Sequence, residues 1–276
     1  MQPVGGRSLS WDGHLVLVHD SESQRRAGVS AWVRRGLDLG AKIVYIEPRD
    51  VATERSLVRV LQDDGVDADE VLERGQLEVF RAGDDRFYRE TWFTKVLEDA
   101  LAEGYPTVRW SAEADTAWSV MSPEVHASVE AMTDLMCRSQ PVSVLCQYSS
   151  RLGEATLQTV CALHADGLRG ALVQTTPLPD GCAVAGEVDR SDARMLHLAL
   201  AAASAEPRED DSAFVVDLGA LDFLDVAGAR ALVTGTETHR ARGGTVCLRS
   251  AQPNVAHLLR LLGVDRLDGF SLEGSS

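Results

Sequence analysis

From residue 14 to about residue 175, short apolar runs alternate with segments whose apolar residues recur every three to four positions. The runs have the length of β-strands, and the intervening spacing is typical of helices that cover a sheet. Several runs are almost entirely apolar, as in parallel strands that are covered on both faces. The pattern predicts a three-layer α/β domain with a mostly parallel sheet over residues 1–174. Its expected strands are 14–19, 42–47, 77–82, 107–112, 142–148 and 170–176.

The segment TTPLPDG (175–181) interrupts this pattern with two prolines and a glycine, a composition typical of a linker. We therefore expect a linker at 175–180 and a second, smaller α/β domain at 181–276. Within that domain AFVVDLG reads as a buried strand, and a helix is predicted from Val226. A final helix is indicated by Val255, Leu258 and Leu262 on one face.

The composition restricts the partners that the chain can have. The formal net charge of −15 is spread along the chain, so neither nucleic acid nor an anionic membrane is an expected direct partner. The five cysteines are scattered without a CxxC pair, which argues against a disulfide framework and a structural zinc site. No signal peptide and no apolar run of about 20 residues is present, so a cytoplasmic location is expected.

The strings GEVDRSDARMLHLAL, FVVDLGALDFLDVAGARALV and GGTVCLRSAQPNVAHLLRLLGVDRL occur in order over roughly 180–270. Together they resemble the STAS domain, the family of anti-sigma-factor antagonists and of cytoplasmic domains of sulfate transporters. In the bacterial regulators of that family, an Asp-Ser-Ser-Gly-like turn opens a helix, and its second serine is phosphorylated by an anti-sigma factor that is a serine kinase. The resemblance implies a partner-binding turn at Asp225, Val226, Ala227 and Gly228.

This turn lacks the hydroxyl that would be phosphorylated, because Ala227 occupies the place of the second serine. Phosphate at a helix N-terminus would add about two negative charges to the partner-binding face. One interpretation is that the domain still binds its partner and behaves as permanently dephosphorylated. The other is that the architecture serves dimerisation or holds the first domain. Thr234, Thr236 and Thr238, expected on the same helix, are alternative phosphorylation sites or merely exposed polar residues.

The strings HLVLVHDSESQRRAGVSAWVRRGLDLGAKIVYIEP, GQLEVFRAGDDRFY, VRWSAEADTAW and VSVLCQYSSRLGEATLQTVCALHADGL cover most of 14–170. They are similar to the MEDS domain, a sensory module named from methanogen, methylotroph and dichloromethane-regulator proteins. The resemblance implies a RecA-like fold that senses a small, hydrocarbon-derived molecule. A RecA-like ATPase needs a glycine-rich loop ending in lysine after its first strand. The loop HDSESQRRAGVS has no lysine, so ATP hydrolysis and a nucleotide cofactor are not expected.

Two arguments nominate ligand-binding residues in the first domain. Ligands of open α/β sheets collect at the carboxyl ends of strands, which favours His19 and Glu113. Matching to the MEDS motifs adds further positions. Each histidine can also be a structural residue at the edge of a strand, and Cys146 can be a thiol of the hydrophobic core. The spacing of these residues alone does not predict a metal site. The candidate ligand-binding residues are His14, His19, Glu113, Trp118, Cys146, Tyr148 and His164.

These features predict a non-enzymatic bacterial signalling protein. A sensor domain, with a possible small-molecule ligand, is coupled to a STAS output that binds an anti-sigma factor, a serine kinase or a related signalling protein. Two alternatives stay open: a structural scaffold in a homo-oligomer, and a degenerate nucleotide-binding α/β protein. No catalytic triad or paired-carboxylate motif names a reaction.

Overall fold

The computed structural model describes residues 9–82, 89–115, 121–205 and 213–273 of the chain. It divides into two compact units. The N-terminal unit is Trp11–Leu152, and the C-terminal unit is Gly153–Ser276 together with Met1–Ser10. Both combine helices with a mostly parallel sheet, so the expected α/β class is confirmed.

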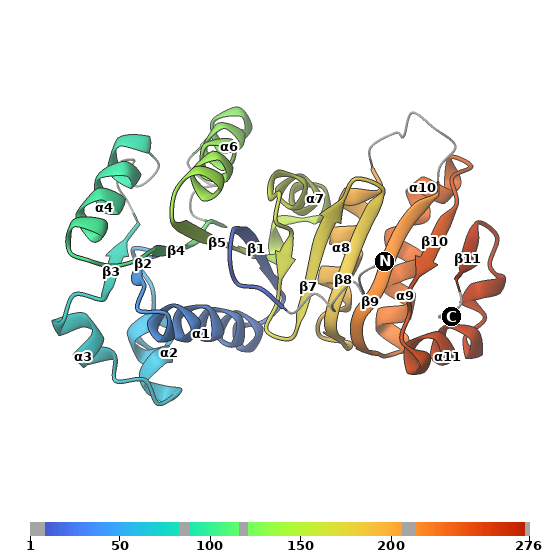
Figure 1. Cartoon of the computed structure of the whole chain (residues 1–276), viewed down its shortest axis with the longest axis horizontal. Coiled ribbons are helices and arrows are strands. Elements are labelled where there is room, and N and C mark those ends of the chain that lie inside the picture. The colour runs from blue at the N-terminus through green and yellow to red at the C-terminus, as the bar shows by residue number, and fades with distance from the viewer. Residues whose placement is uncertain (1–8, 83–88, 116–120, 206–212, 274–276) are drawn as a thin grey trace. The chain divides into compact units, whose positions relative to one another are not determined.

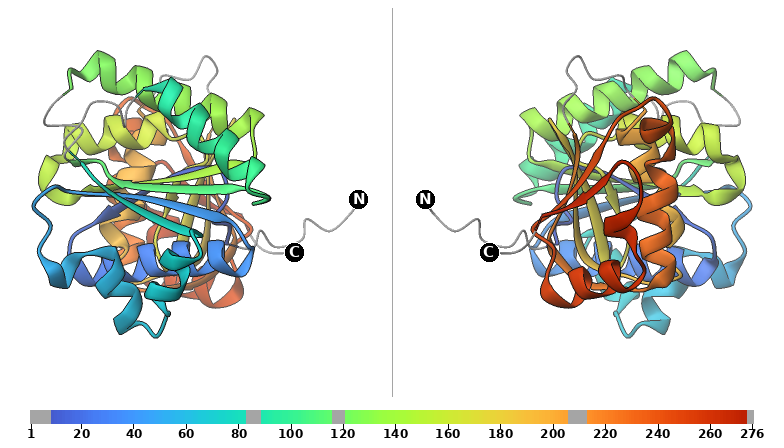
Figure 2. Two further views of the ribbon diagram at one scale, coloured as in Figure 1. Left: turned by 90° about the vertical axis from the view of Figure 1, so that its left-hand side faces the viewer. Right: turned by 90° about the vertical axis from the view of Figure 1, so that its right-hand side faces the viewer.

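The N-terminal unit is built on five parallel strands in the order β1-β5-β4-β2-β3. All six residues of β2 are buried, which agrees with the apolar run at 43–46 in its centre. Helices cover both faces, with α1, α2 and α3 on one side and α4 and α6 on the other (Figures 1 and 2). The strands are β1 (His14–His19), β2 (Lys42–Glu47), β3 (Leu77–Arg81), β4 (Val108–Glu113) and β5 (Val142–Ser149), and the helical segments are α1 (Glu22–Asp38), η1 (Thr53–Arg55), α2 (Leu57–Asp63), α3 (Ala68–Glu73), α4 (Glu90–Ala102), α6 (Pro123–Ser139) and η3 (Ser150–Leu152).

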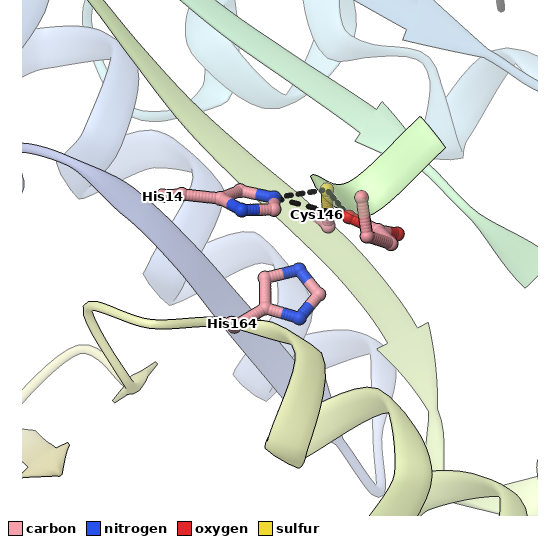
Figure 3. Close-up of side chains that lie close together, drawn as sticks. His14, Cys146 and His164 are labelled. Atoms are coloured by element: carbon pink, nitrogen blue, oxygen red, sulfur yellow. Dashed lines mark hydrogen bonds and ion pairs between the residues drawn. The ribbon is translucent and has the colours of Figure 1, made fainter. Parts of the chain in front are cut away.

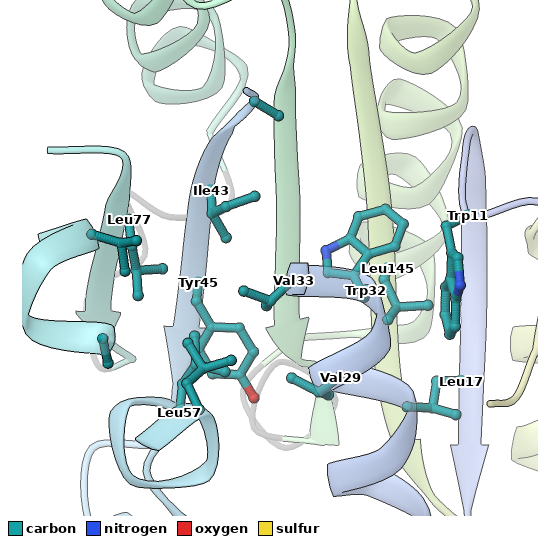
Figure 4. Close-up of a cluster of buried hydrophobic side chains, with 14 of the residues drawn as sticks. Trp11, Leu17, Val29, Trp32, Val33, Ile43, Tyr45, Leu57, Leu77 and Leu145 are labelled. Atoms are coloured by element: carbon teal, nitrogen blue, oxygen red, sulfur yellow. The ribbon is translucent and has the colours of Figure 1, made fainter. Parts of the chain in front are cut away.

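The core on the α1 side explains why α1 packs so closely on the sheet (Figure 4). Trp32 is fully buried and meets Trp11 edge to face, with ring centroids 6.1 Å apart. A Cβ on Gly28 would lie 2.8 Å from Leu17 Cδ2, so the absence of a side chain there allows the helix to approach β1. The N-terminus of α1 is closed by a capping box between Ser21 and Gln24.

The C-terminal unit carries its helices α8 and α9 on one face of its sheet (Figure 2, right). Strands β8, β9, β10 and β11 are parallel, and β6 and β7 extend the sheet in antiparallel fashion beside β8. The strands are β6 (Leu168–Arg169), β7 (Val173–Leu178), β8 (Gly181–Val188), β9 (Phe214–Leu224), β10 (Val246–Arg249) and β11 (Phe270–Leu272), and the helical segments are α7 (Glu154–Leu163), α8 (Ala193–Ala203), α9 (Val226–Gly235), α10 (Glu237–Ala241), α11 (Pro253–Leu261) and η4 (Val264–Arg266).

The residues expected to form a linker, 175–180, instead belong to a β-hairpin. Strand β7 runs through Pro177 to Leu178 and turns directly into β8, with Leu178 opposite Gly181. Only two residues of β7 pair with β6, and Pro177 lies beyond them, near the end of the strand. The N–H that proline lacks is therefore not needed for a hydrogen bond to β6. The proline-rich composition marks a tight turn here and not a break between domains.

Among the residues that the structure describes, no helix combines the length and the apolar character needed to cross a membrane.

Candidate functional site

The pleat of the N-terminal sheet sends alternate side chains of β1 and β5 to opposite faces. Leu15 and Leu145 belong to the hydrophobic core that contains α1. The neighbouring positions His14 and Cys146 therefore point to the α6 side. Position 14 of β1 pairs with position 144 of β5, which brings these two strands' polar residues close together.

Five buried residues on the α6 side and the partly exposed Asp134 form one connected group, the thiol–histidine cluster: His14, His126, Glu130, Asp134, Cys146 and Tyr148. His14 Nε2 lies 3.1 Å from Glu130 Oε2 and 3.7 Å from Cys146 Sγ, while Cys146 Sγ lies 3.9 Å from the same carboxylate oxygen (Figure 3). The other histidine nitrogen, Nδ1, lies 2.6 Å from Asp134 Oδ1. One imidazole thus contacts a thiol and two carboxylates.

The second oxygen of Glu130 is held from the other side. The Tyr148 hydroxyl donates to Glu130 Oε1 at 2.8 Å, and His126 Nε2 lies 2.7 Å from the tyrosine oxygen and 3.2 Å from Glu130 Oε1. All three side chains are buried. The carboxylate of Glu130 is therefore fixed in orientation, with Oε2 directed at His14 and Cys146.

Burial and the two carboxylates act in opposite directions on His14. Burial lowers its pKa, but the hydrogen bonds to Asp134 and Glu130 outweigh burial and raise the pKa to about 9. Burial, followed by the nearby Glu130, raises the pKa of the Cys146 thiol well above its ordinary value. Burial also raises the pKa of Tyr148 and lowers that of His126. At neutral pH His14 is therefore an imidazolium, whereas the Cys146 thiol and the Tyr148 phenol are neutral.

An apolar cavity of about 50 Å³ adjoins this cluster. A water molecule needs roughly 10–15 Å³ of such volume, so the cavity accommodates a few waters or one small organic molecule. Glu130, Cys146 and His126 contribute titratable side chains to a wall that is mostly hydrophobic. The remaining lining comes from β2, β4, β5, α4, α6 and the adjoining loops: Ile46, Phe93, Trp110, Ala112, Ala114, Met121, Val129, Thr133 and Val144.

A second polar group, the arginine cluster, lies on the α1 side and consists of Glu22, Arg25, Tyr45, Arg55 and Glu113. Arg25 is 1% exposed, and its guanidinium donates hydrogen bonds to four different residues. It donates to Glu22 Oε1 at 2.6 Å, Tyr45 Oη at 3.0 Å, Glu113 Oε1 at 3.3 Å and the Arg55 carbonyl at 3.0 Å. Arg55 donates in turn to Glu22. The charges of this cluster are neutralised within the fold.

His19, at the end of β1, belongs to the surroundings of the arginine cluster. Burial lowers its pKa to about 4, and the positive charges of Arg25 and Arg55 act in the same direction against the opposing Glu22 and Asp20. His19 is therefore neutral at pH 7. Burial raises the pKa of Glu113, while Arg25 opposes this.

Within the N-terminal unit, the structure thus separates the nominated residues into two groups. His14, Cys146 and Tyr148 come together on the α6 side, whereas Glu113 and His19 belong to the α1 side. His164 lies in the C-terminal unit, where its Nδ1 is 2.8 Å from the Val160 carbonyl oxygen. Trp118 lies outside the described residues.

Sequence analysis missed His126, Glu130 and Asp134, which complete the thiol–histidine cluster. They follow one another at intervals of four on α6 and therefore form a polar stripe on one face of the helix. This stripe is the signal in the sequence from which they could be predicted. Arg25, in the first turns of α1, is also buried, and Glu22 and Glu113 compensate its charge.

In the C-terminal unit, the turn nominated for partner binding caps α9. Asp225 Oδ1 accepts the backbone N–H of Gly228 at 2.8 Å. A Cβ on Gly228 would lie 2.5 Å from Leu224 Cδ1, so the glycine allows the first turn to pack on β9. Val226 is 61% exposed and Phe223 46%, which leaves an apolar pair beside Ala227 at the surface of the unit.

Of the threonines considered as alternative phosphorylation sites, Thr234 lies in α9 as expected, but Thr236 and Thr238 do not. The helix α9 ends at Gly235, so Thr238 lies in α10. Thr236 is fully buried and donates to the Leu232 carbonyl. A kinase has no access to that hydroxyl in the folded chain.

The comparisons with known proteins place two families on the chain. Residues 13–165 match the family described as MEDS, the MEthanogen/methylotroph, DcmR Sensory domain. Residues 171–272 match the family described as Mlab, STAS domain. The comparison with curated proteins finds no match.

Proposed function

The chain belongs to the MEDS family of sensory domains and carries a STAS domain C-terminal to the MEDS domain. On this basis we propose that it is a bacterial regulator that binds a small ligand and a partner protein. The ligand site is the cavity beside the thiol–histidine cluster. The output is an anti-sigma-factor antagonist that lacks the usual phosphoserine. In this proposal neither domain turns over a substrate.

The observation that carries the sensing role is an apolar cavity with convergent polar atoms at one end. Small-molecule sites are typically concave and mostly hydrophobic, with a few polar groups that orient the ligand. The volume of about 50 Å³ favours a ligand of very few heavy atoms. His126, Glu130 and Cys146 supply the groups that would orient it, and Phe93 with Trp110 supplies an aromatic wall.

The exposed residues around Ala227 support the output role. Phe223 and Val226 present apolar area on either side of the Asp225 cap, at the position where the STAS regulators present their phosphorylatable turn. A phosphate would place about two charges on this apolar surface and weaken docking. Since Ala227 has no oxygen to accept phosphate, the surface stays permanently competent for binding.

The direct test mixes the purified chain with serine-kinase anti-sigma factors of the same genome and ATP, and measures both complex formation and phosphate incorporation. We expect a complex without phosphate for the natural sequence. Ala227→Ser should incorporate phosphate and lose the complex as it does so. Ala241→Ser, which adds a hydroxyl to an exposed position of α10, is the matched control and should do neither.

Two results would contradict the output role. One is that no complex forms with any of these kinases. The other is that Val226→Asp, which puts a charge into the apolar pair, leaves a complex unchanged.

A further inference from the structure

Three different kinds of metal ligand converge in the thiol–histidine cluster from three separate elements. His14 opens β1, Glu130 lies on α6 and Cys146 lies on β5. Their ligand atoms Nε2, Oε2 and Sγ lie 3.1, 3.7 and 3.9 Å from one another. We propose that these three residues bind a divalent transition-metal ion of the zinc class. Binding displaces one proton from the His14 imidazolium and one from the Cys146 thiol into solvent, because only the neutral imidazole and the thiolate are metal ligands.

The spacing of the three atoms fits a tetrahedral ion. Zinc–ligand distances of about 2.0–2.3 Å place neighbouring ligand atoms roughly 3.3–3.6 Å apart. The observed separations differ from this by a few tenths of an ångström. Thiolate, imidazole and carboxylate together suit zinc, cobalt and iron(II), and they do not suit calcium or magnesium, which prefer all-oxygen sites.

The surroundings of the three ligands are those of a supported metal site. A ligating histidine usually gives its other nitrogen to a carboxylate, which fixes the ring, and Asp134 occupies that place at 2.6 Å from Nδ1. Tyr148 and His126 hold the other oxygen of Glu130 at 2.8 and 3.2 Å. A metal site explains why two carboxylates contact one buried imidazole. A hydrophobic core without a bound ion has no use for such a group.

The cavity gives the ion an exchangeable position. Glu130 and Cys146 line the cavity wall, so a water or a ligand atom within the cavity would complete the coordination of an ion held by three protein residues. This assignment rests on the proposed sensing role of the same cavity and adds the chemistry by which a ligand is held. Metal binding is measured without any partner protein, so its failure is distinguishable from failure of the output role.

Cobalt(II) is the probe that tests the site. The full chain is stripped with a chelator, dialysed and titrated with Co²⁺ under reducing conditions. We expect about one ion per chain, visible d–d bands and a sulfur-to-cobalt charge-transfer band, all abolished by added Zn²⁺. Cys146→Ser should lose the charge-transfer band while circular dichroism shows an unchanged fold. Cys137→Ser, on α6 and half-buried, is the matched control and should keep it.

Asp134→Asn separates a metal site from a hydrogen-bonded core. This positioning residue should keep the spectrum but bind cobalt about 10- to 100-fold more weakly, since it acts through His14. Glu130→Gln should lose most of the affinity. The proposal is overturned if the natural chain binds no stoichiometric Co²⁺, or if Cys146→Ser keeps the charge-transfer band of the natural chain.

Discussion

The two faces of the N-terminal sheet both contain buried charges, but their surroundings differ. On the α1 side Arg25 is enclosed by two carboxylates, a phenol and a backbone carbonyl, and hydrophobic core packs around it. On the α6 side Glu130 and Cys146, which both contact His14, line a cavity. We interpret the compensated charge on the α1 side as structural, and we propose a binding role only for the ligand atoms beside the cavity.

The largest expected effect is on the α1 side. Replacing Arg25 by methionine leaves the largely buried Glu113, and the partly exposed Glu22, without their main cation, which should cost about 3–5 kcal/mol in free energy of unfolding. Urea denaturation measures this. Arg26→Met is the control, because its ion pair with Asp63 is partly exposed and should be worth at most about 1 kcal/mol. Equal losses for the two variants would remove the distinction between the clusters.

A pH effect of about 2 kcal/mol is expected from His19. Its folded pKa of about 4 lies below the unfolded value of about 6.5, so the unfolded chain takes up the proton first as the pH falls. Its contribution is complete above pH 6.5 and is lost as the pH falls toward 4. The natural chain should therefore lose about 2 kcal/mol more than His19→Gln between pH 7 and pH 4.5. Parallel stability curves for the two proteins would contradict a neutral His19.

Filling the cavity should have a smaller effect, of opposite sign. Val129 lines the cavity from α6, and Val129→Phe should raise the free energy of unfolding by about 1 kcal/mol by occupying the space. Val125→Phe, four residues earlier and exposed, should change it by less than about 0.5 kcal/mol. Thermal denaturation compares them. If Val129→Phe destabilises the chain more than Val125→Phe does, the cavity is too small for a phenylalanine ring, and this would contradict its assignment as a ligand site.

An effect of similar size, but destabilising, concerns the cap of α9 in the other unit. Asp225→Ala removes the acceptor for the Gly228 N–H and should cost about 1 kcal/mol. Asp225→Asn, which can still cap, should cost less than half of that. Chemical denaturation of both variants measures the difference, and equal losses would show that the charge and not the hydrogen bond matters.

Much of the fold follows from local sequence pattern. The runs at 14–19 and 42–47 coincide with β1 and β2, and the helix expected from Val226 begins there. The failure at 175–180 has a local cause too: proline and glycine signal a turn, and sequence alone does not say whether the turn joins two strands or two domains.

The candidate site was only partly accessible from the sequence. His14 and Cys146 are separated by 132 positions, and His14 and Asp134 by 120, so their proximity depends on the parallel pairing of β1 with β5. Sequence pattern predicts strands but not their order in the sheet. The face of the sheet on which Glu113 or Cys146 lies is known only when the strand order and register are known. For this reason the sequence nominates residues of two opposite clusters as one site.

Zinc-dependent stability tests the contrast between the two faces most directly. At a free Zn²⁺ concentration of about 100 times the dissociation constant, binding to the folded state should add about 2.7 kcal/mol to the free energy of unfolding. We expect this gain in the natural chain, an equal gain in the less stable Arg25→Met protein, and none in Cys146→Ser. A gain that persists in Cys146→Ser, or that disappears in Arg25→Met while its fold is intact, would contradict the account.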